Sequence, residues 1–113
     1  MLLERAPGAD VNVTSKEANG VTALWQACQN GHGEVVRLLL ASSGIDVNQA
    51  RTDNGSTPLF QACYDGNTPV AELLLISSDI DLNKVPQGWS LLRAARENNH
   101  TEIVQLLIDA GAQ

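Results

Sequence analysis

Two short motifs, His32-x-Glu34 and His100-x-Glu102, each place an imidazole and a carboxylate two residues apart. In zinc deaminases such a pair serves a metal site only together with a downstream P-C-x-x-C segment. This sequence contains no such segment. Both copies also fall at one position of the repeat described below. We therefore interpret the motifs as structural, and we predict no bound metal and no cofactor.

Two cysteines, Cys28 and Cys63, are the other source of chemistry. A reactive thiol needs a partly exposed, electropositive setting, whereas each of these residues follows an alanine on a helix that we expect to be packed. Their equivalent places in neighbouring units lie about 8–10 Å apart, beyond the roughly 7 Å Cα separation that a disulfide allows. No phosphate-binding glycine loop and no Ser/His/Asp set accompanies them. We expect reduced core cysteines, and we predict that the chain is not an enzyme.

The chain has 113 residues and a formal net charge of −6. Its length is that of one domain, and an acidic chain without a basic stripe repels phosphate backbones, which argues against a nucleic acid partner. A neutral or basic protein surface suits it better. No apolar run reaches the roughly 18 residues of a membrane span, and residues 1–5 are too soon charged for a secretory signal. We expect a cytoplasmic or nuclear protein with no membrane partner.

The chain repeats itself. Residues 20–48 and residues 55–83 are offset by 35 positions and are identical at 16 of 29 aligned positions, and a third copy starts at Gly88, offset by a further 33. A period of 33–35 residues is typical of stacked supersecondary units.

Each unit carries signals for two short helices. The first helix begins at an N-cap residue type in all three copies: Thr22, Thr57 and Ser90. Its end is predicted at a residue that tolerates a left-handed conformation: Gly31, Gly66 and Asn99. The second helix is expected to begin near Glu34, Pro69 and Glu102, with Thr68 as the cap before Pro69. Its apolar face is predicted to contain Val35, Leu38, Leu39 and Ile45 in the first unit and Val70, Leu73, Leu74 and Ile80 in the second.

The pattern G-x-T-P-L-x-x-A-C-x-x-G followed by V-x-x-L-L-L and D-V-N resembles the ankyrin repeat. Residues 55–59, which read GSTPL, and residues 31–36, which read GHGEVV, are its closest copies. The resemblance implies an all-α solenoid of stacked helix-turn-helix units joined by hairpin-like turns. We divide this single domain, residues 1–113, into a partial N-terminal repeat at 1–18, repeats at 19–52 and 53–85, and a C-terminal repeat at 86–113.

The sequence departs from the family pattern at two places in the first helix. Ala23 and Leu91 replace its opening proline, and Trp25, Phe60 and Arg93 replace its usual histidine. The hydrogen-bond network of that histidine is therefore absent, and we expect the two aromatic residues to pack between units.

Ankyrin repeats bind along the turn tips and first helices, so the resemblance implies one strip of contact residues in each repeat. The strips are Ala18, Asn19, Val21, Gln29 and Asn30; Asp53, Asn54, Ser56, Tyr64 and Asp65; and Pro86, Gln87, Trp89, Glu97 and Asn98. Trp89 and Tyr64 stand out because exposed aromatic residues often anchor interfaces. The alternative for Trp89 is that it folds back over its own helix.

Asn48 and Asn83 each end an Asp-aliphatic-Asn triplet, eight residues after Leu40 and Leu75. In the ankyrin family this arrangement resembles sites of asparaginyl hydroxylation. The alternative is that each amide bonds local backbone in its turn.

Three functions compete at this point. The first is a protein-binding module, monomeric, that uses the strips. The second is a structural piece of a longer array, or an engineered scaffold, which could self-associate through Leu2, Leu3 and Trp25 at its N-terminal face. The third is an enzyme that uses His32 or His100.

Overall fold

The structure, a computed structural model, describes residues 20–112. These residues form six α helices and no strand. The helices are α1 (Ala23–Gln29), α2 (Gly33–Leu40), α3 (Pro58–Asp65), α4 (Thr68–Leu75), α5 (Leu91–Glu97) and α6 (Thr101–Asp109). They follow one another in pairs, and the all-α fold expected from the sequence is confirmed.

The first helix of each pair begins where the sequence predicts. The hydroxyls of Thr22, Thr57 and Ser90 each accept a hydrogen bond of 3.0–3.1 Å from the backbone N–H three residues later. Such a bond satisfies one of the N–H groups that a helix start leaves unpaired. Pro58 takes the first position of α3, where a missing N–H costs nothing.

The left-handed residues predicted at the ends of these helices are confirmed, but only Gly66 is itself the C-cap, since the C-caps of α1 and α5 are Asn30 and Asn98. Gly31 and Gly66 have φ angles of 71° and 80°, and Asn99 is the one non-glycine residue with positive φ, 60°, in the part described. The chain then turns directly into the second helix.

The predicted cap of α4 is wrong by one residue. Thr68 lies inside the helix, and Asn67 is its N-cap, without a side-chain capping bond. The amide of Asn67 instead donates to the carbonyl oxygen of Cys28 in the preceding helix pair, at 2.9 Å. A contact between helix pairs, rather than a local capping bond, thus determines the orientation of the Asn67 side chain.

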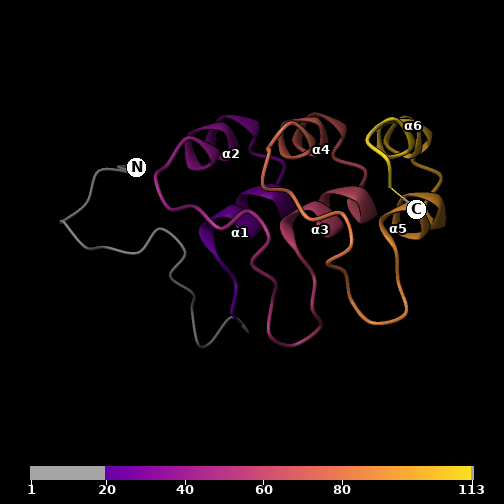
Figure 1. The fold of residues 1–113 in the computed structure, drawn as a ribbon, viewed down its shortest axis with the longest axis horizontal. Coiled ribbons are helices and arrows are strands. Elements are labelled where there is room, and N and C mark those ends of the chain that lie inside the picture. The colour runs from indigo at the N-terminus through magenta and orange to yellow at the C-terminus, as the bar shows by residue number, and fades with distance from the viewer. Residues whose placement is uncertain (1–19, 113) are drawn as a thin grey trace.

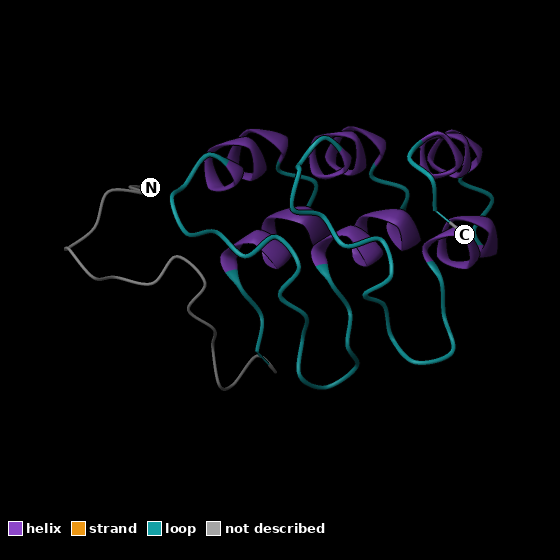
Figure 2. Cartoon of the chain, viewed as in Figure 1, coloured by secondary structure: helices purple, strands orange, loops and turns teal. Residues whose placement is uncertain are grey.

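The six helices form two layers. Helices α1, α3 and α5 lie side by side in one layer and α2, α4 and α6 in the other, and each helix also packs on the other member of its pair (Figure 1). The long turns before α3 and α5 extend from the first layer, on the side away from the second (Figure 2). The stack is elongated, with extents of 41 × 25 × 22 Å.

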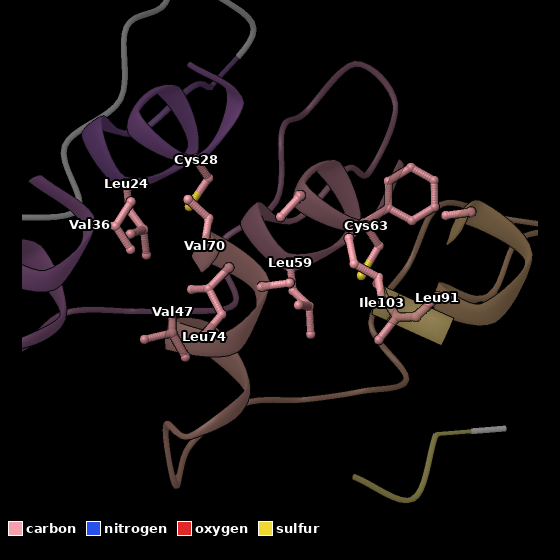
Figure 3. Packing of buried hydrophobic residues seen from close by; sticks show 14 of the residues in the cluster. Leu24, Cys28, Val36, Val47, Leu59, Cys63, Val70, Leu74, Leu91 and Ile103 are labelled. Carbon is pink, nitrogen blue, oxygen red and sulfur yellow. The ribbon is translucent and has the colours of Figure 1, made fainter. Parts of the chain in front are cut away.

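Aliphatic side chains, alanine and cysteine fill the space between the layers. Figure 3 shows Leu24, Leu59 and Leu91 from the first layer together with Val36, Val70 and Ile103 from the second. All of these are at most 2% exposed. Because alanine is small, Ala62, Ala94 and Ala95 let neighbouring helices approach closely, and each is 0% exposed.

The predicted apolar face of α2 is wrong at Leu38. Its side chain is 56% exposed, whereas Val36 is fully buried. Val36 and Leu39 are three residues apart and face the core together, while Leu38 is turned by about 100° from Leu39 around the helix. The other predicted positions of the two second helices and the loops after them are buried or half-buried.

Candidate partner-binding surface

Three aromatic rings meet at the junction between the second and third helix pairs. Phe60 and Tyr64 lie one helical turn apart on α3, with ring centroids 6.3 Å apart and planes 18° from parallel. Trp89, from the turn before α5, packs nearly perpendicular to both, at centroid distances of 5.5 Å and 5.9 Å. Such edge-to-face pairs stabilise beyond their buried area.

Trp89 holds this position by contacts on both sides. Besides the rings of α3, it contacts Arg93 of α5, whose guanidinium carbon lies 4.2 Å from the indole centroid. Arg93 also donates to the carbonyl oxygen of Gly88 at 2.9 Å. Trp89 is thus half-buried. It is neither a fully exposed ring nor one that packs on the following helix alone, because it also contacts Phe60 and Tyr64 of α3. Tyr64 is 37% exposed.

A surface hollow of about 250 Å³ opens beside these rings. Its walls come from the turns and first helices of two neighbouring pairs: Asn54, Ser56, Phe60, Gln61, Tyr64, Pro86 and Trp89. It therefore joins residues of the second and third predicted strips.

The three carboxylates of these strips differ in their partners. Asp53 forms a bidentate ion pair with Arg51, at 2.6 Å and 2.9 Å, and the hydrogen bond from Arg51 lowers the pKa of the carboxyl. Glu97 lies 3.9 Å from Arg93. Asp65 accepts a bond of 2.8 Å from the neutral amide of Gln61. Among residues 20–112, Asp65 forms no ion pair within 4.0 Å.

Ser56, predicted as a contact residue, is 1% exposed, which corrects the prediction that it faces a partner. Its hydroxyl accepts a bond of 3.2 Å from the indole Nε1 of Trp25 and donates to Gln61 Oε1 at 3.2 Å. Trp25 is itself 2% exposed, so its side chain is not available for the self-association proposed through it. Leu2 and Leu3 lie outside the described residues.

The remaining strip residues occupy different surroundings. Asn54, Gln87, Gln29 and Asn30 are exposed, while Val21 and Pro86 are half-buried. Asn98 is exposed, and its amide donates to the carbonyl oxygen of Tyr64 at 2.9 Å. Ala18 and Asn19 lie outside the described residues. The structure thus brings the second and third strips together at the hollow, and Asn30 lies apart on the first pair.

The two triplet asparagines are not equivalent. The side chain of Asn48 bonds the next repeat rather than its own turn: its amide donates to the Asp79 carbonyl oxygen and accepts from the Asp81 N–H, both at 2.8 Å. Asn83 is exposed, and the backbone N–H of each asparagine donates to the carboxylate two residues earlier, Asp46 or Asp81. Hydroxylation of either residue stays a prediction.

The groups singled out for chemistry form no common site, and His32 is exposed at the start of α2 without a side-chain capping bond. Cys28 and Cys63 are fully buried and unbridged, and burial raises the pKa of each thiol to about 12. His100 Nε2 lies 3.1 Å from the Tyr64 carbonyl oxygen, to which it donates. Within residues 20–112, no three His, Cys, Asp or Glu side chains gather as a metal site would require.

The sequence interpretation missed Phe60 and Gln61 as parts of this surface. Phe60 packs between units as expected, against Trp89 of the next unit, and its position four residues before Tyr64 also predicts a shared helix face. Gln61 and Asp65 show the same spacing, which favours a side-chain bond.

A second hollowed region lies in the other helix layer. Two adjoining depressions of about 330 Å³ and 520 Å³ run between α2 and α4, with Arg37, Leu73 and Ile76 in both. Ile76 is 80% exposed. None of the predicted contact residues lines this region.

No helix in residues 20–112 is both long and apolar enough to cross a bilayer. A comparison with curated proteins found no match. A family model described as ankyrin repeats, in three copies, matches residues 1–86, and a model of a single ankyrin repeat matches residues 87–113. Repeats of this kind are generally protein–protein interaction modules without catalytic activity. With the whole length matched and the paired helices in two layers, the chain belongs to the ankyrin repeat family.

Proposed function

We propose that this chain is a non-catalytic module that binds a neutral or basic partner protein through its turn tips and first helices, with the aromatic hollow at the centre of the contact. The observation that carries the proposal is the hollow itself. It joins two helix pairs and has Tyr64 and Trp89 in its walls, so one partner group can contact both repeats at once.

The side chains around the hollow suit an interface anchor. Tyr64 and Trp89 are held by contacts with Phe60 and with each other, so binding immobilises few additional torsions. Binding energy concentrates on aromatic residues in such preformed sites. The acidic charge of the chain favours encounter with a neutral or basic surface.

The depressions between α2 and α4 are the competing surface. Ile76, which is 80% exposed, and Leu73 line both of them, but they present no aromatic ring. A partner bound there would fit the alternative in which the chain is a structural piece of an array or a scaffold. The two surfaces lie in different helix layers, so they can be altered independently.

The two unbridged thiols are consistent with a reducing compartment, so we also propose a cytoplasmic or nuclear location. The hypothesis of an enzyme that uses His32 or His100 is not favoured, because ankyrin repeats are generally non-catalytic and no three His, Cys, Asp or Glu side chains gather as a metal site within residues 20–112.

The test is a pull-down from cell lysate with three proteins: the native chain, a Tyr64→Ala, Trp89→Ala variant, and an Arg37→Ala, Ile76→Ala control, whose two residues line both depressions. We expect a protein that the native chain and the control retain and the aromatic variant loses. Circular dichroism must show equal helicity in all three. Retention by all three, or by none, would remove the aromatic surface from consideration, and loss in the control alone would move the binding surface to α2 and α4.

A further inference from the structure

The hollow has an uncompensated negative charge beside it. Asp65 follows Tyr64 directly in α3, and its carboxylate is bonded to Gln61, which lines the hollow. The other two carboxylates of the surface face arginines, Asp53 at 2.6 Å and Glu97 at 3.9 Å. Those two pairs are close to neutral, so Asp65 is the carboxylate of this surface that no arginine neutralises.

The position of this carboxylate is fixed by a chain of buried and half-buried groups. Gln61 donates to Asp65 at 2.8 Å and accepts from the Ser56 hydroxyl at 3.2 Å. Ser56 in turn accepts from the Trp25 indole at 3.2 Å. The orientation of Asp65 is thus set before any partner arrives, which reduces the entropic cost of binding.

The walls of the hollow suit a cation with an apolar stem. Faces of Trp and Tyr attract ammonium and guanidinium groups, and long basic side chains bury their methylenes against apolar surface while the charged end stays near water. Arg93 contacts Trp89 but is not among the lining residues, so its guanidinium leaves the hollow open.

The size of the hollow limits its occupant. At about 250 Å³ it is smaller than the roughly 300–1,000 Å³ of small-molecule pockets. It has room for a single extended side chain rather than for a helix or strand of a partner.

We propose that the hollow receives one lysine or arginine side chain of the partner, with its stem against Tyr64 and Trp89 and its charged end at Asp65. This inference rests on the proposed function and specifies the chemistry of the partner residue at its centre. An uncharged aliphatic side chain would use the same walls but gain nothing from Asp65.

The test uses two small probes that differ in the amine alone, Nα-acetyl-lysine methylamide and Nα-acetyl-norleucine methylamide. Each is titrated into the native chain and followed by chemical shifts of the Tyr64 and Trp89 signals. We expect the lysine probe to bind at least about fivefold more tightly, from the cation–π and Coulomb attraction. Equal binding of the two probes, no binding of the lysine probe, or largest shifts outside the hollow would each overturn the proposal.

Two carboxylate variants form the matched control. Asp65→Asn should reduce the advantage of the lysine probe to about twofold or less, since only the aromatic attraction remains. Glu102→Gln makes the same change of charge on α6, in the other helix layer, and should leave the advantage unchanged. If both variants weaken binding equally, the general acidity of the chain rather than Asp65 is responsible, and the proposal is wrong.

The outcome is separable from that of the pull-down. A partner lost by the aromatic variant together with equal binding of both probes would leave the partner surface in place and exclude the basic side chain. The lysine probe could instead be preferred while the aromatic variant still retains the partner. The hollow would then bind a cation, but the partner would bind elsewhere. The basic residue would not belong to the partner, and the inference as stated would fail.

Discussion

The indole Nε1 of Trp25 and the hydroxyl of Ser56 form a hydrogen bond of 3.2 Å between residues 31 positions apart in the sequence. Both side chains are buried, at 2% and 1% exposure. The bond connects the first helix of one pair to the turn before the first helix of the next. Trp25 stands at the helix position where the ankyrin pattern has a histidine. Its indole N–H therefore provides a polar connection between neighbouring repeats.

Replacing Ser56 by alanine should therefore destabilise the fold. The indole N–H of Trp25 would be left buried without its acceptor, which costs about 1–3 kcal/mol of unfolding free energy. The measurement is urea-induced unfolding followed by circular dichroism.

A double-mutant cycle isolates the bond from other effects of Ser56→Ala. In a Trp25→Phe background there is no indole N–H to satisfy, so Ser56→Ala should cost at least about 1 kcal/mol less than in the native chain. Equal costs in the two backgrounds would show that the bond contributes no stability.

Thr57 and Ser56 show where sequence interpretation succeeds and where it ends. The cap at Thr57 depends on a backbone N–H three residues away, so local residue types suffice to predict it. The burial of Ser56 depends on an indole 31 residues earlier, and nothing near Ser56 in the sequence signals that contact. For the same reason Asn67, which bonds Cys28 across 39 residues, is missed as the N-cap in favour of Thr68.

The candidate surface likewise has features that the sequence predicts and features that depend on contacts between distant residues. The repeat period predicts that Tyr64 and Trp89 lie near each other, because their strips are adjacent in the stack. It does not predict that Phe60 completes the cluster, or that Asp53 is neutralised by Arg51 while Asp65 is not. Those distinctions depend on side-chain conformations, which the period leaves open.

Gly66 should tolerate no side chain. Its φ of 80° is unfavourable for alanine, and an added Cβ would overlap the imidazole ring of His100. To make room the ring must leave the Tyr64 carbonyl oxygen, to which it donates at 3.1 Å. We expect Gly66→Ala to cost about 1–2 kcal/mol from the left-handed backbone and a further 0.5–1.5 kcal/mol or so from the lost bond, measured by urea unfolding.

Gly44 is the matched control for this substitution. It has the same φ of 80°, but an added Cβ meets no heavy atom within 4 Å. Gly44→Ala should thus show the backbone cost alone. In a His100→Ala background the cost of Gly66→Ala should fall to the Gly44 value. An unchanged cost there would mean that the ring is not the obstacle.

Asn48 and Asn83 provide a second matched pair. Asn48→Ala removes two bonds of 2.8 Å between successive repeats, to Asp79 and Asp81. At exposed sites these contribute about 1–2 kcal/mol together. Asn83→Ala removes an exposed side chain, for which a change within about 0.5 kcal/mol is expected. Thermal unfolding of the two variants under one set of conditions tests the difference, and equal losses would contradict it.

The two buried thiols should make stability fall at alkaline pH. Burial raises the pKa of Cys28 and Cys63 from 9.0 to about 12, so the unfolded chain loses these protons first. Below pH 9 both states hold the protons and the full stability is present. Between pH 9 and about 12 the unfolded state binds fewer protons, so the free energy of unfolding decreases, by up to about 1.4 kcal/mol per pH unit for each thiol.

Urea unfolding at pH 7, 8.5 and 10 measures this decrease, and a Cys28→Ala, Cys63→Ala variant is the control. Tyrosine and lysine side chains also titrate in this range, but they do so in both proteins. The variant will be less stable at every pH, because alanine leaves small cavities in the core. Its stability should nevertheless depend less steeply on pH above 9 than that of the native chain. If the two curves are parallel, the thiols ionise equally in the folded and unfolded states, and burial does not protect them.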